Sequence, residues 1–239
     1  MRLVMTGLVV GLLATAACGG SGDPAGRSHP DEAPATVQRS PGQPADAPSA
    51  ARPRIVFLGD SLTAGLGLAA DASYPALLQQ RLDAEGYRYD VVNAGVSGDT
   101  SAGGVRRLEW SLEGDVRILV VALGANDGLR GLPPNEMRKN LSAILGRAQA
   151  QGITIILTGM EAPPNYGAEY TRQFREVYTD LAREYRVRLL PFLLQGVAGV
   201  ATLNQADGIH PNTRGARIVA DSVWEALKPE LERSTAVSS

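Results

Sequence analysis

The stretch that decides the fold is VRILVVAL, residues 116–123. It is almost continuously apolar and rich in β-branched residues, which is typical of a strand buried on both faces of a parallel sheet. Shorter apolar runs of the same kind recur at regular intervals on either side of it. They are residues 55–58, 89–92, 153–157 and 187–190. These runs are predicted to be strands of one sheet.

Segments with a helical spacing of apolar residues separate the predicted strands. The clearest segment is 134–149, in which Met137, Leu141 and Ile144 recur on one face. The other expected helices are residues 75–85, 168–185 and 215–227. Strands that alternate with helices form βαβ units, which build a parallel sheet covered by helices on both faces. We therefore expect an α/β fold with a central parallel sheet.

The first 53 residues differ in composition from the rest, so we expect the folded domain at residues 54–230. Residues 1–17 carry a basic residue, Arg2, near their start and continue with an apolar run too short to span a bilayer. This pattern is typical of a secretory signal peptide. Cys18 follows small residues, as in the lipobox of bacterial lipoproteins, which predicts a lipid anchor on Cys18. The alternative is cleavage near Ala17 and a freely exported protein, so the expected location is periplasmic or at the cell surface.

A linker is expected between the signal peptide and the domain. Residues 18–53 are rich in proline, alanine and glycine and contain no aromatic residue, leucine or isoleucine. Such a segment buries too little apolar surface to offset its chain entropy, so disorder is predicted. A short flexible tail is expected at residues 231–239.

The overall composition excludes several classes of protein. The chain has 239 residues, a formal net charge of −2, one cysteine and two histidines. The slightly acidic balance argues against a nucleic-acid partner, and a single cysteine excludes a Cys-rich zinc site. We expect no metal and a monomer. Because His29 lies in the predicted linker, a reaction that needs an imidazole must use His210.

Polar residues follow the predicted strands, where the carboxyl ends of parallel strands share one edge. A serine hydroxyl needs a base to become a nucleophile, and an imidazole base gains from a neighbouring carboxylate. Ser61 follows the first strand, and Asp207 stands three residues before His210. We expect these three to be catalytic. The oxyanion would accept hydrogen bonds from the backbone N–H groups of Ser61 and Gly98 and from the Asn126 amide.

Four blocks of sequence resemble, in this order, those of the GDSL or SGNH hydrolase family. They are Gly59-Asp60-Ser61-Leu62, Gly98, Gly124-x-Asn126-Asp127 and Asp207-x-x-His210-Pro211. The resemblance implies a flavodoxin-like three-layer α/β/α sandwich. It also implies that Ser61, Gly98, Asn126 and His210 are the signature positions, with Asp207 completing a triad.

Further segments are similar to the arylesterase, thioesterase I and lysophospholipase L1 branch of this family. They are residues 97–100, 126–131, 164–167 and 207–212. The resemblance implies hydrolysis of small acyl esters, thioesters or lysophospholipids without a cofactor. The chain departs from the branch at Ala125, where a second glycine is common. A carbohydrate O-acetyl esterase and a non-catalytic surface binding protein remain as alternatives.

Several other side chains carry expectations from the sequence alone. Asn165 and Tyr166 are expected to line an acyl groove or to serve only as a structural loop. Trp110 and Trp224 are expected in the core. Structural roles in loops are expected for Asp60, Asp99 and Asp127, and a solvated face is expected for Arg106, Arg107 and Arg130.

Overall fold

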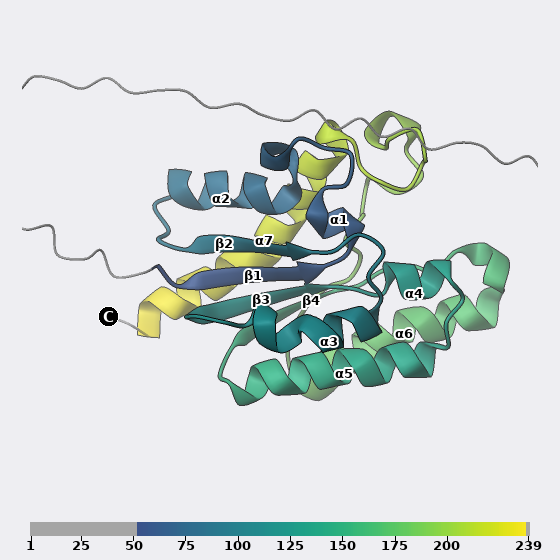
Figure 1. Ribbon diagram of the computed structural model, residues 1–239, viewed down its shortest axis with the longest axis horizontal. Coiled ribbons are helices and arrows are strands. Elements are labelled where there is room, and N and C mark those ends of the chain that lie inside the picture. Colours follow the sequence, from purple (N-terminus) through teal and green to yellow (C-terminus); the bar gives the residue numbers. More distant parts are fainter. Residues whose placement is uncertain (1–51, 238–239) are drawn as a thin grey trace, which may run out of the picture. The chain divides into compact units, whose positions relative to one another are not determined.

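The computed structural model describes residues 52–237, with side chains up to residue 233 (Figure 1). The predicted signal peptide, Cys18 and nearly all of the predicted linker lie outside this range. Within residues 52–237, no helix is both long and apolar enough to cross a membrane.

Parallel strands form a single sheet in the order β2-β1-β3-β4-β5. The strands are β1 (Arg54–Gly59), β2 (Asp90–Gly95), β3 (Val116–Ala122), β4 (Thr154–Thr158) and β5 (Arg188–Leu190). Each strand overlaps a predicted one, and the prediction of a parallel sheet is confirmed. The decisive stretch forms β3, in which residues 118–121 are fully buried.

Helices cover both faces of the sheet, with α2 and α7 on one side and α3, α5 and α6 on the other (Figure 1). The α-helices are α1 (Ser61–Ala64), α2 (Tyr74–Ala84), α3 (Ser101–Ser111), α4 (Ala125–Leu129), α5 (Pro134–Ala150), α6 (Ala168–Tyr185) and α7 (Thr213–Val237). Short 3-10 helices occupy Ala70–Ala72, Pro164–Tyr166 and Ala201–Leu203. The three-layer α/β/α fold expected from the family resemblance is confirmed.

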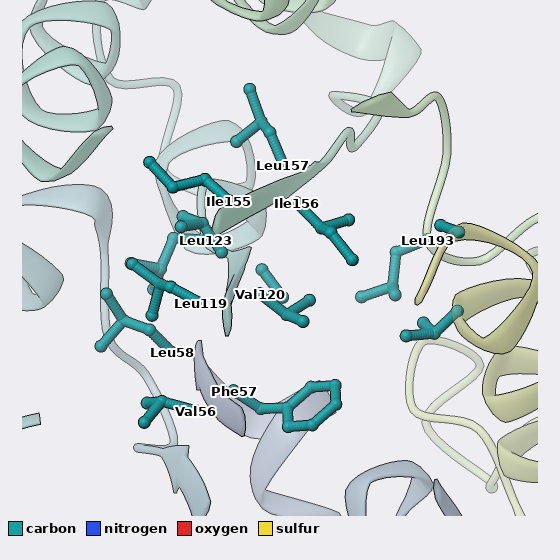
Figure 2. Packing of buried hydrophobic residues seen from close by; sticks show 14 of the residues in the cluster. Val56, Phe57, Leu58, Leu119, Val120, Leu123, Ile155, Ile156, Leu157 and Leu193 are labelled. Atoms are coloured by element: carbon teal, nitrogen blue, oxygen red, sulfur yellow. The ribbon is translucent and has the colours of Figure 1, made fainter. Parts of the chain in front are cut away.

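The core fills the space between the sheet and each helical layer, as Figure 2 shows for the side chains of β1, β3 and β4. Neighbouring residues of a strand point to opposite faces, so each strand contributes to both halves of the core. On one face, the Phe57 ring meets Tyr74 of α2 edge-on at 5.7 Å between ring centroids. On the side covered by α6, the buried Tyr178 hydroxyl donates to the Leu123 carbonyl at 3.0 Å.

Helix α3 is absent from the sequence prediction because two adjacent glycines weaken its helical pattern. The tight packing of α3 accounts for one of them. A Cβ on Gly104 would lie 2.2 Å from Leu123 Cδ1. Trp110 on this helix was expected in the core, and that prediction is wrong because its side chain is 67% exposed. Trp224 of α7 is only 3% exposed, which confirms the prediction for that residue.

Helix α7 continues to Val237, beyond residue 230, where the sequence predicts a flexible tail to begin. Two buried residues account for the extension. Leu231 is fully buried, and the Glu230 carboxylate accepts a hydrogen bond from Arg188 of β5 at 2.5 Å. Glu230 and Leu231 thus hold α7 against the rest of the domain at the point where the tail was expected to begin.

Candidate active site

The candidate site lies at the carboxyl edge of the sheet, on either side of the junction between β1 and β3. Strand order reverses at this junction, which is where open parallel sheets bind ligands. Ser61 begins helix α1 directly after β1, and the buried Asp60 caps that helix by accepting the Leu62 N–H at 3.0 Å. After β3 the chain turns at Gly124, whose φ of 113° favours glycine. The turn leads into α4 and Asn126.

A continuous chain of hydrogen bonds joins Ser61, His210 and Asp207. The Ser61 Oγ lies 2.9 Å from His210 Nε2, and His210 Nδ1 lies 2.6 Å from Asp207 Oδ2. The other Asp207 oxygen accepts the backbone N–H groups of Ile209 and His210 at 3.0 and 3.1 Å. Residues 149 positions apart in sequence thus meet at one point of the sheet edge.

The Asp207 carboxylate stays ionised under all ordinary conditions. Its hydrogen bond to the His210 side chain, helped by the two backbone N–H groups, lowers the pKa of Asp207 to about 2. An ionised carboxylate on Nδ1 holds the imidazole with Nε2 facing the serine and stabilises the ring when it gains a proton.

Asn126 and Gly98 lie near the same point. The Asn126 amide donates to the Asp99 carbonyl at 2.9 Å and, at a longer 3.4 Å, to Asp60 Oδ2. Gly98 precedes Asp99 and has a φ of 81°, which lets the loop after β2 turn beside the site. Its carbonyl accepts a hydrogen bond from Arg130 at 2.8 Å. Side chains that follow β3 therefore hold the loop after β2 through the backbone carbonyls of Gly98 and Asp99.

Asp60 is a second carboxyl group at the site, and its side chain is almost completely enclosed. Its residue exposure is 1%, and burial raises its pKa to about 6 against the ordinary 3.8. The bonds from Leu62 and Asn126 lower that pKa and offset burial only in part. These contacts agree with the expected structural role.

A groove of about 460 Å³ opens beside the Ser61–His210 pair. Its walls come mainly from the loops after β3, β4 and β5 and from the segment before α7. Apart from Ser61, Asn126, His210 and Glu161, the lining is apolar or glycine: Leu62, Ala125, Leu129, Met160, Ala162, Pro163, Phe192, Leu194, Ala198, Gly199, Gly208 and Ile209. This geometry can hold a flexible apolar chain with one end at the Ser61 hydroxyl.

Asn165 and Tyr166 do not line this groove within residues 52–237. Both are exposed on the short 3-10 helix after β4. The Tyr166 hydroxyl donates to the carbonyl of Leu129, which does line the groove, at 2.9 Å. Contact of Asn165 or Tyr166 with a substrate stays a prediction.

The sequence analysis did not predict two features of the site. The apolar groove wall is assembled from separate loops that carry no shared pattern. Arg107 was expected on a solvated face, and that prediction is wrong because its side chain is only 15% exposed and each of its three guanidinium nitrogens donates a hydrogen bond behind the site. Among the described residues, no three His, Cys, Asp or Glu side chains come together as a metal site would require.

Known proteins are similar to this chain in sequence and in fold. The model of the GDSL-like lipase/acylhydrolase family matches residues 57–218. The chain belongs to this family. Esterase TesA of Pseudomonas aeruginosa is 45% identical over 183 residues, which cover 76% of this chain and 91% of TesA. The thioesterase 1/protease 1/lysophospholipase L1 of Escherichia coli K12 is 39% identical over 182 residues, covering 76% and 86% of the two chains.

The folds agree as well. A crystal structure of TesA superimposes with a TM-score of 0.71, covering 74% of this chain and 98% of that one. The psychrotrophic esterase EstA from Pseudoalteromonas sp., solved in a form inhibited by monoethylphosphonate, has a TM-score of 0.72 at 36% identity, with coverage of 75% and 98%. Membership of the family and these relatives make the present chain a carboxylic ester hydrolase.

Proposed function

We propose that this hydrolase cleaves acyl esters through a triad of Ser61, His210 and Asp207. The observation that carries the proposal is the unbroken chain of contacts of 2.9 and 2.6 Å that joins the three side chains beside an apolar groove. As Ser61 Oγ attacks the acyl carbon, its proton passes to His210 Nε2. The protonated imidazole then gives this proton to the leaving oxygen or sulfur, and an acyl-enzyme remains.

Hydrolysis of the acyl-enzyme repeats the same proton transfers with water. Water attacks the acyl carbon while His210 takes its proton, and collapse of the intermediate returns that proton to Ser61 Oγ and releases the acid. Both steps place negative charge on the former carbonyl oxygen. We assign its stabilisation to the backbone N–H groups of Ser61 and Gly98 and to the Asn126 amide, since preorganised donors contribute most where charge develops.

The groove favours substrates with an apolar acyl chain. Its wall is built from side chains such as Met160, Phe192 and Leu194, and each methylene moved from water onto such a wall contributes about 0.8 kcal/mol. The proposed substrates are therefore medium- to long-chain acyl esters, thioesters or lysophospholipids. A carbohydrate O-acetyl esterase would gain nothing from this wall, because an acetyl group is too short to reach along it.

A fluorophosphonate probe tests the nucleophile directly, because it forms a covalent bond with an activated serine. The wild type and Ser222→Ala, which removes a hydroxyl bonded only within α7, should label and hydrolyse p-nitrophenyl octanoate equally. Ser61→Ala should neither label nor hydrolyse, and His210→Ala should lose several orders of magnitude in kcat. Activity that survives in Ser61→Ala would overturn the proposed mechanism.

We also propose that residues 1–17 direct export and that Cys18 becomes lipidated, which would tether the domain to a membrane through residues 18–53. Residues 1–51 lie outside the described structure, so the proposal rests on the sequence pattern. Labelled palmitate should be incorporated by the wild type and not by Cys18→Ser. Equal labelling of both would exclude Cys18 as the anchor, and absence of label in both would favour free export.

A further inference from the structure

Behind the site, Arg107 of α3 contacts the ends of β1 and β2 and the loop that follows β2. Its side chain projects from the middle of α3 toward the carboxyl ends of β1 and β2. Arg107 Nη2 donates to the Gly59 carbonyl at 2.7 Å, Nη1 donates to the Ala94 carbonyl at 2.6 Å, and Nε donates to Asp99 Oδ2 at 2.6 Å. Every nitrogen of the guanidinium group is thus bonded to a different segment, and the group is largely shielded from water.

Each of these three contacts leads to one of the proposed oxyanion donors. Gly59 is two residues before Ser61. Ala94 and Asp99 stand on either side of Gly98 in the chain. The Asp99 backbone carbonyl, in turn, accepts the Asn126 amide. Arg107 therefore connects the segments that carry Ser61 and Gly98 directly, and it reaches Asn126 indirectly through Asp99.

We propose that Arg107 is a positioning residue. It fixes the relative positions of the segments that carry Ser61, Gly98 and Asn126, so that their donors converge on one oxyanion. The proposal rests on the proposed function, because it concerns the same intermediate. Arg107 touches neither the groove nor the Ser61 hydroxyl, so it acts only through the loops. Guanidinium suits this role because its donors lie in one rigid plane, whereas a lysine ammonium is a point charge on a flexible stem.

The surroundings of Arg107 leave little freedom for a different arrangement. Asp99, the carboxylate partner of Arg107, packs closely on α3. A Cβ on Gly103 of this helix would lie 2.1 Å from Asp99 Oδ1. The backbone also joins the two loops directly, since the Val96 N–H donates to the Gly59 carbonyl at 3.0 Å. That carbonyl accepts from Arg107 as well, so the arginine adds a second link where the loops already meet.

The first experiment compares Arg107→Lys with Arg138→Lys. Arg138 makes an exposed ion pair with Glu184 at 2.6 Å on the surface of the α5–α6 layer, and its replacement serves as the matched control. Misplacement of catalytic groups by about 1 Å costs about 100-fold in rate. We therefore expect Arg107→Lys to lower kcat on p-nitrophenyl octanoate about 10- to 100-fold with KM changed less than about threefold, while Arg138→Lys keeps wild-type values.

The second readout separates positioning from a loss of folded protein. An alkylboronic acid forms a tetrahedral anionic adduct with a catalytic serine, so its affinity reports the oxyanion donors. Titration with the fluorophosphonate probe gives the concentration of active enzyme. In Arg107→Lys, the boronate Ki should then rise by the same factor as kcat/KM falls. Added guanidinium should restore part of the kcat of Arg107→Gly. Unchanged kcat, or reduced kcat with an unchanged boronate Ki, would overturn the proposal.

Asp99→Asn provides a variant that keeps the shape of the loop if Arg107→Lys fails to fold. Its backbone carbonyl can still accept the Asn126 amide, but the charged partner of Arg107 is lost. We expect the same parallel change of kcat/KM and boronate Ki in this variant, and wild-type values for both would also overturn the proposal. Failure of the proposed function would be seen separately, as activity or probe labelling that persists in Ser61→Ala.

Discussion

Asp207 holds His210 through both of its carboxylate oxygens. Oδ2 lies 2.6 Å from the ring nitrogen Nδ1, while Oδ1 accepts the backbone N–H of the same residue at 3.1 Å. One carboxylate therefore fixes the ring and the backbone that carries it. Because Asp207 is only three residues before His210, the local turn creates this geometry without help from the sheet.

Asp207→Asn should strongly impair catalysis while leaving the fold intact. The amide keeps an oxygen for the backbone N–H groups but can present its NH₂ to Nδ1, which favours the wrong tautomer of His210. We expect kcat to fall by about 10⁴-fold, as for the equivalent change in a serine protease triad. The Asp207 side chain is 45% exposed, so the melting temperature should change little. Activity within tenfold of wild type would contradict the assigned role.

Asn126→Ala should remove one of the proposed oxyanion donors. Loss of such a donor costs about 100- to 1,000-fold in kcat, so we expect a decrease of this size with little change in KM. Asn140→Ala is the matched control, because its amide is also partly buried and donates to the Ser101 hydroxyl at 3.0 Å outside the groove. Equal kcat values for the two variants would argue against Asn126 as an oxyanion donor.

The buried carboxyl of Asp60 predicts a pH dependence of stability. Its pKa is about 6 in the folded protein against an ordinary 3.8, so between these values the folded state binds more protons than the unfolded state. Stability contributed by this group is therefore present at low pH and lost as the pH rises through about 6.

Asp60→Asn removes this dependence. Between about pH 4 and about pH 7, its free energy of unfolding relative to wild type should rise by roughly 2–3 kcal/mol. Urea unfolding at both pH values measures the change, and Asp71→Asn, at an exposed aspartate, should show no comparable trend. A relative stability of Asp60→Asn that falls with rising pH would contradict the assigned burial.

The groove predicts a change in acyl-chain preference when its mouth is narrowed. Ala198 is exposed and lines the groove, so Ala198→Trp should obstruct a long acyl chain but not an acetyl group. We expect the ratio of kcat/KM for octanoate over acetate esters to fall at least about tenfold, since a few methylenes displaced into water suffice. Ala201→Trp, on an exposed 3-10 helix outside the groove lining, should keep the wild-type ratio.

The two tryptophans predict contrasting effects on stability. Trp224 packs in the core, where its ring meets Tyr87 at 6.0 Å between centroids, so Trp224→Ala should cost about 3–5 kcal/mol. Trp110 is exposed on α3, and Trp110→Ala should stay within about 0.5 kcal/mol of wild type. Denaturant unfolding of both variants measures the difference, which would vanish if the two rings were equally buried.

The sequence by itself determined the strands, most of the helices and the order of the site residues. Apolar runs such as residues 116–123 identify a buried parallel strand because both of its faces need apolar side chains. The proposed base could be predicted for an equally local reason, since only one histidine lies within the predicted domain and Asp207 is three residues before it.

Only the tertiary structure decided which side chains face water and which loops meet. Trp110 and Arg107 stand on one short helix, and the sequence predicted the wrong environment for each. Their exposure depends on how α3 packs against the sheet, and the glycines that permit this packing weaken the helical pattern itself. The groove also depends on the tertiary structure, because its wall combines residues far apart in the chain. These residues come close together only when the parallel strands bring their carboxyl ends to one edge.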